Sequence, residues 1–176
     1  MSGAPPGGGA GARAALATPR LRLVPLSERD RSLYCAIYGD PVLMRHVDAP
    51  LSPAEADRSF ALALAESTGR ATGTSWWTAT HRQARANVGV LGLRHAGDTA
   101  EIGVMLVAGW QGRGLAAEAI DVLLAAAFSR AGLARILMRH APGNAPCMDV
   151  ARALGFSHLE GEPDVAGRVT WQRLRP

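Results

Sequence analysis

The pattern of apolar and polar residues predicts alternating strands and helices from about residue 18 onward. Leu21 and Leu23 alternate with arginines, which is the period of two that is typical of a half-buried strand. Ser52 opens a capping box with a proline at the first helical position, and this arrangement predicts the start of a helix. The segment 115–131 is strongly apolar with few charges, so we expect a helix that is buried on most sides.

The same pattern gives the order of the remaining elements. The predicted elements are a strand over 18–26, helices over 29–38 and 52–67, strands over 75–81, 87–94 and 99–107, a helix over 115–131, a strand over 135–140, a helix over 144–154, and strands over 156–161 and 168–174. Short polar links indicate an antiparallel meander for the three central strands and a hairpin for the last two. We therefore predict an α/β fold with a mixed, mostly antiparallel sheet of about seven strands flanked by about four helices.

Composition changes sharply near the start of this pattern. Residues 1–16 are dominated by glycine, proline and alanine, which predicts a disordered tail, whereas 17–176 is long enough for one domain with its own core. The chain has no uncharged apolar run of about 18 residues and no clear secretory signal, so we expect no membrane span. The cysteines Cys35 and Cys147 are too few for a disulfide framework, and reduced thiols are typical of the cytoplasm, where we expect the protein to act.

The net charge of +4 comes entirely from arginine, because the chain contains no lysine. This excludes a Schiff-base lysine and a P-loop lysine. The arginines are scattered along the chain, so a nucleic-acid-binding patch is not indicated. The histidines are scattered as well, and no metal site is expected.

A glycine-rich segment, 109–114, lies between the predicted strand 99–107 and the predicted helix 115–131. A helix N-terminus presents unpaired backbone N–H groups and a partial positive charge, and glycines allow close approach to an anion. The segment therefore predicts a main-chain phosphate site, which by itself would suit several nucleotides.

Three motifs, which follow one another along the chain, narrow the choice of nucleotide. The spacing Gln111-x-x-Gly114-x-Ala116 resembles the pyrophosphate signature of the GCN5-related N-acetyltransferases (GNAT). The run Ala-Glu-Ile-Gly at 100–103 is similar to the branch that includes ribosomal-protein N-terminal acetyltransferases, as is the start of the strand over 18–26. Downstream, Asn144-x-x-Cys147 and the Leu-Gly-Phe run at 154–156 resemble a later segment of that family. The resemblance covers roughly residues 18–175.

The resemblance implies a single-domain GNAT-like fold, acetyl-CoA as co-substrate, and direct attack by an amine on the acetyl carbonyl without a covalent enzyme intermediate. It also implies a monomer or a homodimer. The residues that it assigns to coenzyme A are Met105, Leu106 and Val107 beside the pantetheine arm, Gln111, Gly112, Arg113, Gly114, Leu115 and Ala116 at the pyrophosphate, Asn144 at the pantetheine, and Cys147 near the thioester sulfur.

The catalytic groups are less clearly marked. Glu101 is a carboxylate on the strand beside the expected thioester, which suggests a general base. Many family members carry a tyrosine five residues before the phenylalanine of the Leu-Gly-Phe run as the acid for the leaving thiolate, but Ala151 stands there in this chain. Cys147 or a water would then protonate the thiolate, or the thiolate would leave unaided.

The acceptor is left open between a protein N-terminus, a small amine and an aminoglycoside-like amine. His46 lies in the segment that borders the acceptor cleft in this family. Trp76 and Trp77 should face opposite sides of a strand, so one of them is a candidate to line that cleft, and we take Trp76. The alternatives are an acyl-CoA-binding module without activity and a dinucleotide-binding domain. The strand meander before the glycine turn argues against the dinucleotide-binding domain.

Overall fold

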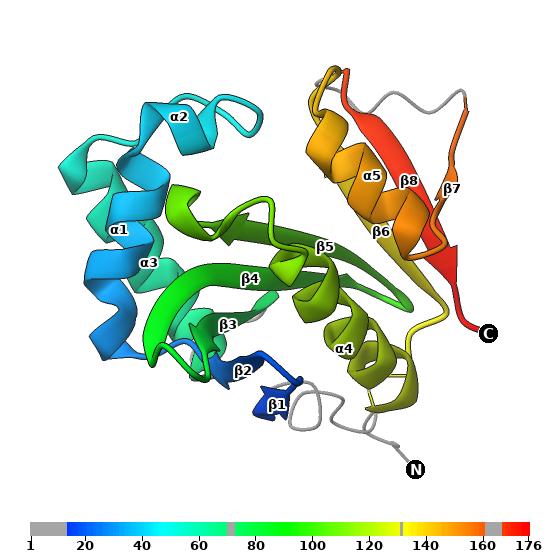
Figure 1. The fold of residues 1–176 in the computed structure, drawn as a ribbon, viewed down its shortest axis with the longest axis horizontal. Helices are drawn as coiled ribbons and strands as arrows, with labels where there is room; N and C mark the ends of the chain where they lie inside the picture. Colours follow the sequence, from blue (N-terminus) through cyan, green and yellow to red (C-terminus); the bar gives the residue numbers. More distant parts are fainter. Residues whose placement is uncertain (1–13, 70–72, 131, 161–166) are drawn as a thin grey trace, which may run out of the picture.

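The computed structural model describes residues 14–69, 73–130, 132–160 and 167–176. The strands are β1 Leu16–Ala17, β2 Leu21–Pro25, β3 Thr74–His81, β4 Ala86–Ala96, β5 Thr99–Leu106, β6 Arg135–His140, β7 Ser157–His158 and β8 Val169–Leu174. The α-helices are α1 Arg31–Gly39, α2 Pro41–Met44, α3 Pro53–Ser67, α4 Leu115–Arg130 and α5 Ala145–Ala153, and the short 3-10 helices are η2 Glu28–Asp30 and η3 Ala108–Trp110. Figure 1 shows how these elements are arranged.

The strands form one sheet in the order β1-β2-β3-β4-β5-β6-β8-β7. All neighbours are antiparallel except β5 and β6, which run parallel. This confirms the predicted mixed, mostly antiparallel sheet with a β3–β4–β5 meander. Within the described residues there are eight strands and five α-helices, and the elements beyond the prediction are the two-residue β1 and the four-residue α2.

The ends of several elements differ from the predicted ranges. The predicted strand over 156–161 is limited to Ser157–His158 in the described part of the chain. Residue 161, residue 131 and residues 1–13 of the predicted tail lie outside the described residues. Leu16, at the end of that predicted tail, instead lies in β1, pairs with Leu23 and is only 8% exposed. The ordered chain therefore includes residues just before the first predicted strand.

Two apolar clusters cover the two faces of the sheet. On one face, Ile102 and other sheet residues pack with Leu115 and Ile120 of α4 and with Ala151 of α5. On the other face, Val90 packs with Tyr34 and Ile37 of α1 and with residues of α3. The helices that pack on each cluster shield its apolar side chains from water. This burial is the main driving force that holds α1 and α3 on one side of the sheet and α4 and α5 on the other.

The sheet divides between β5 and β6. These strands pair only from Thr99 with Arg135 to Glu101 with Leu137, although β5 continues to Leu106 and β6 to His140. Beyond Glu101, β5 keeps β4 as its partner on one edge, and its other edge has no strand partner within the described residues. Figure 1 shows β6, β8 and α5 turning away from β5. None of the helices in the described part is long and apolar enough to cross a membrane.

Candidate active site

A cavity of about 730 Å³ lies where β5 and β6 separate. The alternation of side chains along β5 explains its shape, because successive residues point to opposite faces of the sheet. Ile102 and Leu106 point toward the α4 side and join that core, whereas Met105 points toward the α1 side and packs there. All three line the cavity, as does Gly103 between them. The cavity therefore opens on both faces of the sheet.

The glycine-rich loop forms the wall on the α4 side. Gly112 and Gly114 have φ angles of 70° and 74°, values that favour glycine, and α4 begins directly afterward at Leu115. Gly114 and Leu115 line the cavity together with Gln111, Gly112 and Ala116. The side chain of Gln111 donates a hydrogen bond of 2.8 Å to the carbonyl oxygen of Leu106. This bond ties the loop to the end of β5 and leaves main-chain N–H groups of the loop and helix start as the natural anion donors.

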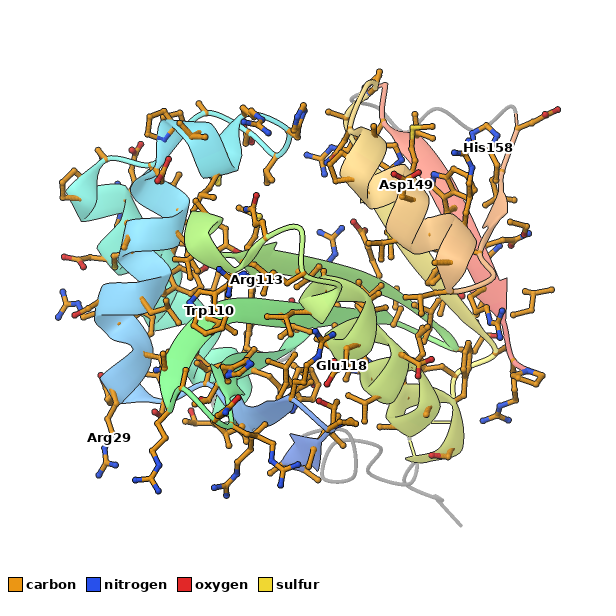
Figure 2. The ribbon with its side chains drawn as sticks, viewed as in Figure 1. Arg29, Trp110, Arg113, Glu118, Asp149 and His158 are labelled. Carbon is orange, nitrogen blue, oxygen red and sulfur yellow. The ribbon has the colours of Figure 1, made fainter. Side chains whose placement is uncertain are left out.

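Two of the residues assigned to the cofactor do not line the cavity. Val107 donates its backbone N–H to the Val88 carbonyl oxygen at 3.0 Å, so this donor is already used within the sheet. Arg113 instead places its guanidinium group over the ring of Trp110, 5.1 Å from the ring centroid (Figure 2). The structure thus brings together the predicted cofactor residues except Val107 and Arg113.

Glu118 fixes the first turn of α4 to the chain before β2. Its carboxylate accepts hydrogen bonds from the Thr18 hydroxyl at 2.5 Å, from the Arg20 backbone N–H at 2.9 Å and from the Arg20 guanidinium group at 2.6 Å. Burial alone would raise the pKa of Glu118, but the hydrogen bonds from Thr18 and Arg20 and the nearby positive charge together hold this pKa below its usual range. Arg20 also donates to the Arg113 carbonyl oxygen at 2.8 Å, so the same contacts hold the loop.

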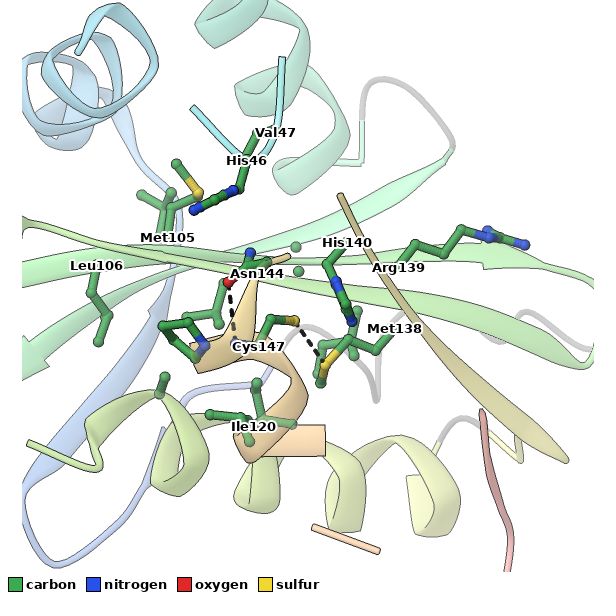
Figure 3. Close-up of a pocket in the computed structure, with 18 of the residues that line it drawn as sticks. His46, Val47, Met105, Leu106, Ile120, Met138, Arg139, His140, Asn144 and Cys147 are labelled. Atoms are coloured by element: carbon green, nitrogen blue, oxygen red, sulfur yellow. Dashed lines mark hydrogen bonds between the residues drawn. The ribbon is translucent and has the colours of Figure 1, made fainter. Parts of the chain in front are cut away.

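The opposite wall of the α4-side opening comes from β6 and the start of α5. Asn144 is the N-cap of α5, and its side-chain oxygen accepts the backbone N–H of Cys147 at 3.2 Å, while both residues line the cavity (Figure 3). The Cys147 thiol contacts the Met138 sulfur at 3.5 Å. Burial raises the pKa of the Cys147 thiol to about 11, so it carries its proton at neutral pH. Ala151, one turn later, is completely buried and offers no acid.

His140 is a cavity residue that the sequence pattern did not single out. Its Nε2 atom lies 3.0 Å from the indole Nε1 of Trp171, and an indole N–H can only donate. Nε2 is therefore the acceptor, and the ring proton is on Nδ1, which donates to the Ala141 carbonyl oxygen at 2.8 Å. Both nitrogens are occupied by protein partners, so His140 holds the wall in place and is not arranged as an acid or a base.

Glu101 lies at the last paired position before β5 and β6 separate. Its carboxylate oxygen Oε2 contacts guanidinium nitrogens of Arg94 at 2.5 Å and of Arg139 at 2.6 Å, and the side chain is 18% exposed. All three residues line the cavity. Neither arginine was predicted as a site residue, because their approach depends on the β4–β5 register and on the parallel pairing of β6, which are not readable from local sequence.

The acceptor-side candidates also line the cavity. Trp76 faces the α1 side, and its indole N–H donates to Glu66 at 2.8 Å, whereas Trp77 is fully buried in the core of the α4 side. This settles which of the adjacent tryptophans borders the cavity. Figure 3 shows His46 and Val47 approaching β5 from the segment after α2.

Comparisons with known proteins agree with this geometry. The family model described as the acetyltransferase (GNAT) domain matches residues 20–157. Among solved structures, an acetyltransferase from Agrobacterium tumefaciens superposes with a TM-score of 0.79 at 24% identity, over 91% of this chain and 94% of that chain. No curated protein matches the chain at a significant level.

Structures described as ribosomal-protein acetyltransferases are also similar in fold. The ribosomal α-N-protein acetyltransferase RimL, in complex with coenzyme A, has a TM-score of 0.77 at 17% identity over 92% of this chain and 98% of that chain. A structure from Vibrio cholerae described as a putative ribosomal-protein-serine acetyltransferase has a TM-score of 0.74 at 19% identity over 92% and 97%.

The family-model match extends over most of the chain, from residue 20 to residue 157. The chain belongs to the GNAT acetyltransferase family, and it is an acyltransferase.

Proposed function

We propose that this protein transfers the acetyl group of acetyl-CoA to a primary amine, which is a small molecule or a protein N-terminus, by direct attack. The observation that carries the proposal is the division of the sheet between β5 and β6, which opens one cavity to both faces beside a helix N-terminus. One opening suits a phosphorylated cofactor and the other leaves room for an acceptor. The relative crystallised with coenzyme A supports the choice of cofactor.

The residues present fit coenzyme A. The loop offers main-chain N–H groups at an anion-binding helix start, with glycines at 112 and 114 that carry no side chain to obstruct a pyrophosphate. Beyond Glu101, the edge of β5 that has no strand partner within the described residues suits the amides of a pantetheine arm, which would add to the sheet as a strand does. The Leu106 carbonyl oxygen is already bonded to Gln111, so the arm would use other main-chain groups of this edge. Asn144 can donate its side-chain N–H₂ to the arm while its oxygen caps α5.

Glu101 is our candidate for the group that receives the proton of the attacking amine, directly or through a water. It lines the cavity at the point where the two openings meet. Both arginines contact the oxygen Oε2, so Oε1 keeps its capacity to accept a hydrogen bond from the amine or a water. Arg94 and Arg139 in this proposal hold the carboxylate in place.

Cys147 is our candidate for stabilising the leaving thiolate. A thiol such as that of coenzyme A ionises near pH 8.5, about 2.5 pH units below the pKa of about 11 at Cys147. Full proton transfer from Cys147 to the thiolate is therefore uphill. The S–H group would instead donate a hydrogen bond to the departing sulfur, and solvent would supply the final proton.

The proposal is tested by initial rates with acetyl-CoA and a panel of primary amines, followed by release of the free thiol and by the mass of the acetylated amine. Direct attack predicts that both substrates must be bound before product leaves, and that protein quenched with acetyl-CoA alone carries no acetyl group. An acetylated protein that passes its acetyl group to the amine would contradict direct attack. Binding of acetyl-CoA with no amine acetylated would favour the inactive acyl-CoA-binding module instead.

A further inference from the structure

The acceptor side of the cavity carries more positive than negative charge. Among the described lining residues, Glu101 is the only carboxylate, whereas Arg45, Arg94 and Arg139 are guanidinium groups, and Arg168 adds a fourth. Even with Arg168 set aside, three guanidinium groups share a single carboxylate. No ion pair within the described residues involves Arg45.

The contacts of Glu101 leave this charge uncompensated. Arg94 and Arg139 contact the same carboxylate oxygen, and one negative charge can balance only one of them. In addition, Nε of Arg139 is buried and has no hydrogen-bond partner within the described part of the chain. Buried donors are nearly always paired in folded proteins, so this N–H marks Arg139 as an incompletely satisfied group in the cavity wall.

The cofactor does not supply that partner, because these arginines lie on the other face of the sheet. Arg94 pairs with Glu101 across β4 and β5, and two residues further along Gly92 pairs with Gly103, which places all four on one face. That face is the α1 side, whereas the glycine-rich loop and α4 cover the opposite face. The phosphates of coenzyme A at the loop would therefore lie away from the arginine cluster.

Gly103 gives an acceptor access to this cluster. No heavy atom lies within 4 Å of the position where a side chain at Gly103 would begin, so the strand surface beside Glu101 is bare. A small molecule or an extended N-terminus can lie directly on the sheet there, next to Arg94 and Arg139.

We infer that the acceptor is an α-amine with a carboxylate close to its nitrogen, and that Arg45, Arg94 and Arg139 select it by charge. This inference rests on the proposed acetyl transfer. A cation-rich cavity repels a lysine ammonium group, whose pKa is about 10.4, and tolerates an α-amine, whose pKa is about 7.7–8.0 and which is partly neutral at pH 7. The carboxylate of the acceptor supplies the negative charge that balances these arginines. A peptide N-terminus followed by an acidic residue has this chemistry, and a free acidic amino acid shares the carboxylate but has a more basic α-amine.

The test compares matched acceptors that differ only in charge. Ala-Asp-Ala-amide, Ala-Asn-Ala-amide and Ala-Arg-Ala-amide are acetylated under the same conditions, and free aspartate is compared with its diamide to separate amino-acid from peptide acceptors. We expect kcat/KM for the aspartyl tripeptide to exceed that for the asparaginyl tripeptide by about tenfold, with the arginyl tripeptide slowest, and the preference to weaken as salt is raised.

Variants identify the groups responsible. Arg45→Gln lies on the exposed segment after α2 and should reduce the aspartyl-over-asparaginyl ratio by about threefold, and Arg139→Gln should reduce it further, because each removes a charge near the carboxylate. Arg29→Gln makes the same change in charge at an exposed residue far from the cavity (Figure 2) and should leave the ratio unchanged. Circular dichroism and melting temperature would show that each variant is folded.

The outcomes separate this inference from the proposed function. Equal kcat/KM for the aspartyl and asparaginyl tripeptides would overturn the charge selection and leave acetyl transfer intact. If no amine is acetylated, the proposed function fails, and equilibrium binding of the two N-acetylated tripeptides to protein saturated with coenzyme A then decides the charge selection. Tighter binding of the aspartyl product, weakened in Arg45→Gln, supports it, and equal binding overturns it.

Discussion

At the scale of single residues, the proposed mechanism depends most on Glu101. It is the carboxylate at the meeting point of the two openings, and two arginines hold it there. Glu101→Gln keeps the shape of the side chain but removes its ability to take a proton. We expect kcat at neutral pH to fall by about a hundredfold while the Kd for acetyl-CoA is unchanged, as measured by steady-state rates and calorimetry.

Glu28→Gln, at an exposed residue of η2, is the control for the change of charge and should behave like the original protein. Turnover that is undiminished in Glu101→Gln would mean that another group or solvent receives the proton.

The buried thiol of Cys147 should make the stability of the protein depend on pH above pH 9. Burial raises the pKa of its thiol from 9.0 to about 11, so between these values the thiol ionises in the unfolded chain but stays protonated in the folded one. The free energy of unfolding should therefore decrease from pH 9 to pH 11, by about 2–3 kcal/mol from this group. Denaturant unfolding of the original protein and of Cys147→Ala over this pH range measures the contribution as the difference between their slopes.

Parallel slopes for the two proteins would contradict a buried, protonated thiol. In the same variant, full activity would show that the leaving thiolate needs no hydrogen bond from Cys147.

Local sequence was enough for some site residues and not for others. Gly114 and Asn144 were predicted because the glycine-rich loop and the Asn144-x-x-Cys147 motif each leave a mark within a few residues of chain. Arg139 and His140 were missed because what brings them to the site is strand pairing: β6 joins β5 in parallel, and Trp171 of β8 fixes the His140 ring. Long-range pairing of this kind leaves no local pattern.

At the scale of elements, the join between the glycine-rich loop and α4 carries the proposed phosphate site. The φ angle of 74° at Gly114 costs a residue with a side chain about 1–2 kcal/mol. Gly114→Ala should lower stability by about that amount and also weaken coenzyme A binding by about tenfold or more, because the loop amides lose their alignment. Calorimetry with coenzyme A measures the affinity, and thermal unfolding measures the stability.

Gly97→Ala is the matched control. Gly97 has a φ angle of 64° in the turn between β4 and β5 and open space around it, so its substitution should cause similar strain without loss of affinity. Equal affinities in both variants would place the cofactor elsewhere.

The elements that the sequence did not predict are the shortest ones. β1 has two residues and α2 has four, and neither is long enough to show a period of apolar residues. α3 was predicted closely because the capping box at Ser52 and the following proline mark its first turn, and α5 also agrees with its predicted range over 144–154. Periodicity and caps therefore give long helices, whereas short elements are set by their neighbours in the fold.

At the scale of the whole molecule, the proposed function rests on the division of the sheet. The predicted order of elements agrees with the mixed sheet, but β5 and β6 pair over only three positions, and no local pattern in the sequence indicates where that pairing stops. The separated strands leave an arginine-rich opening on one face and, on the other, the opening that we propose binds phosphate, so the two substrates of the proposed transfer could meet at Glu101 from opposite faces.

The central claim is that the α4-side opening binds acetyl-CoA. The most direct test is thermal unfolding of the purified protein with acetyl-CoA, coenzyme A or NAD added separately. The account predicts that both coenzyme A ligands raise the stability, by about 2.7 kcal/mol at a hundred times Kd, and that NAD leaves it unchanged. Stabilisation by NAD alone, or no stabilisation by either coenzyme A ligand in a folded sample, would contradict it.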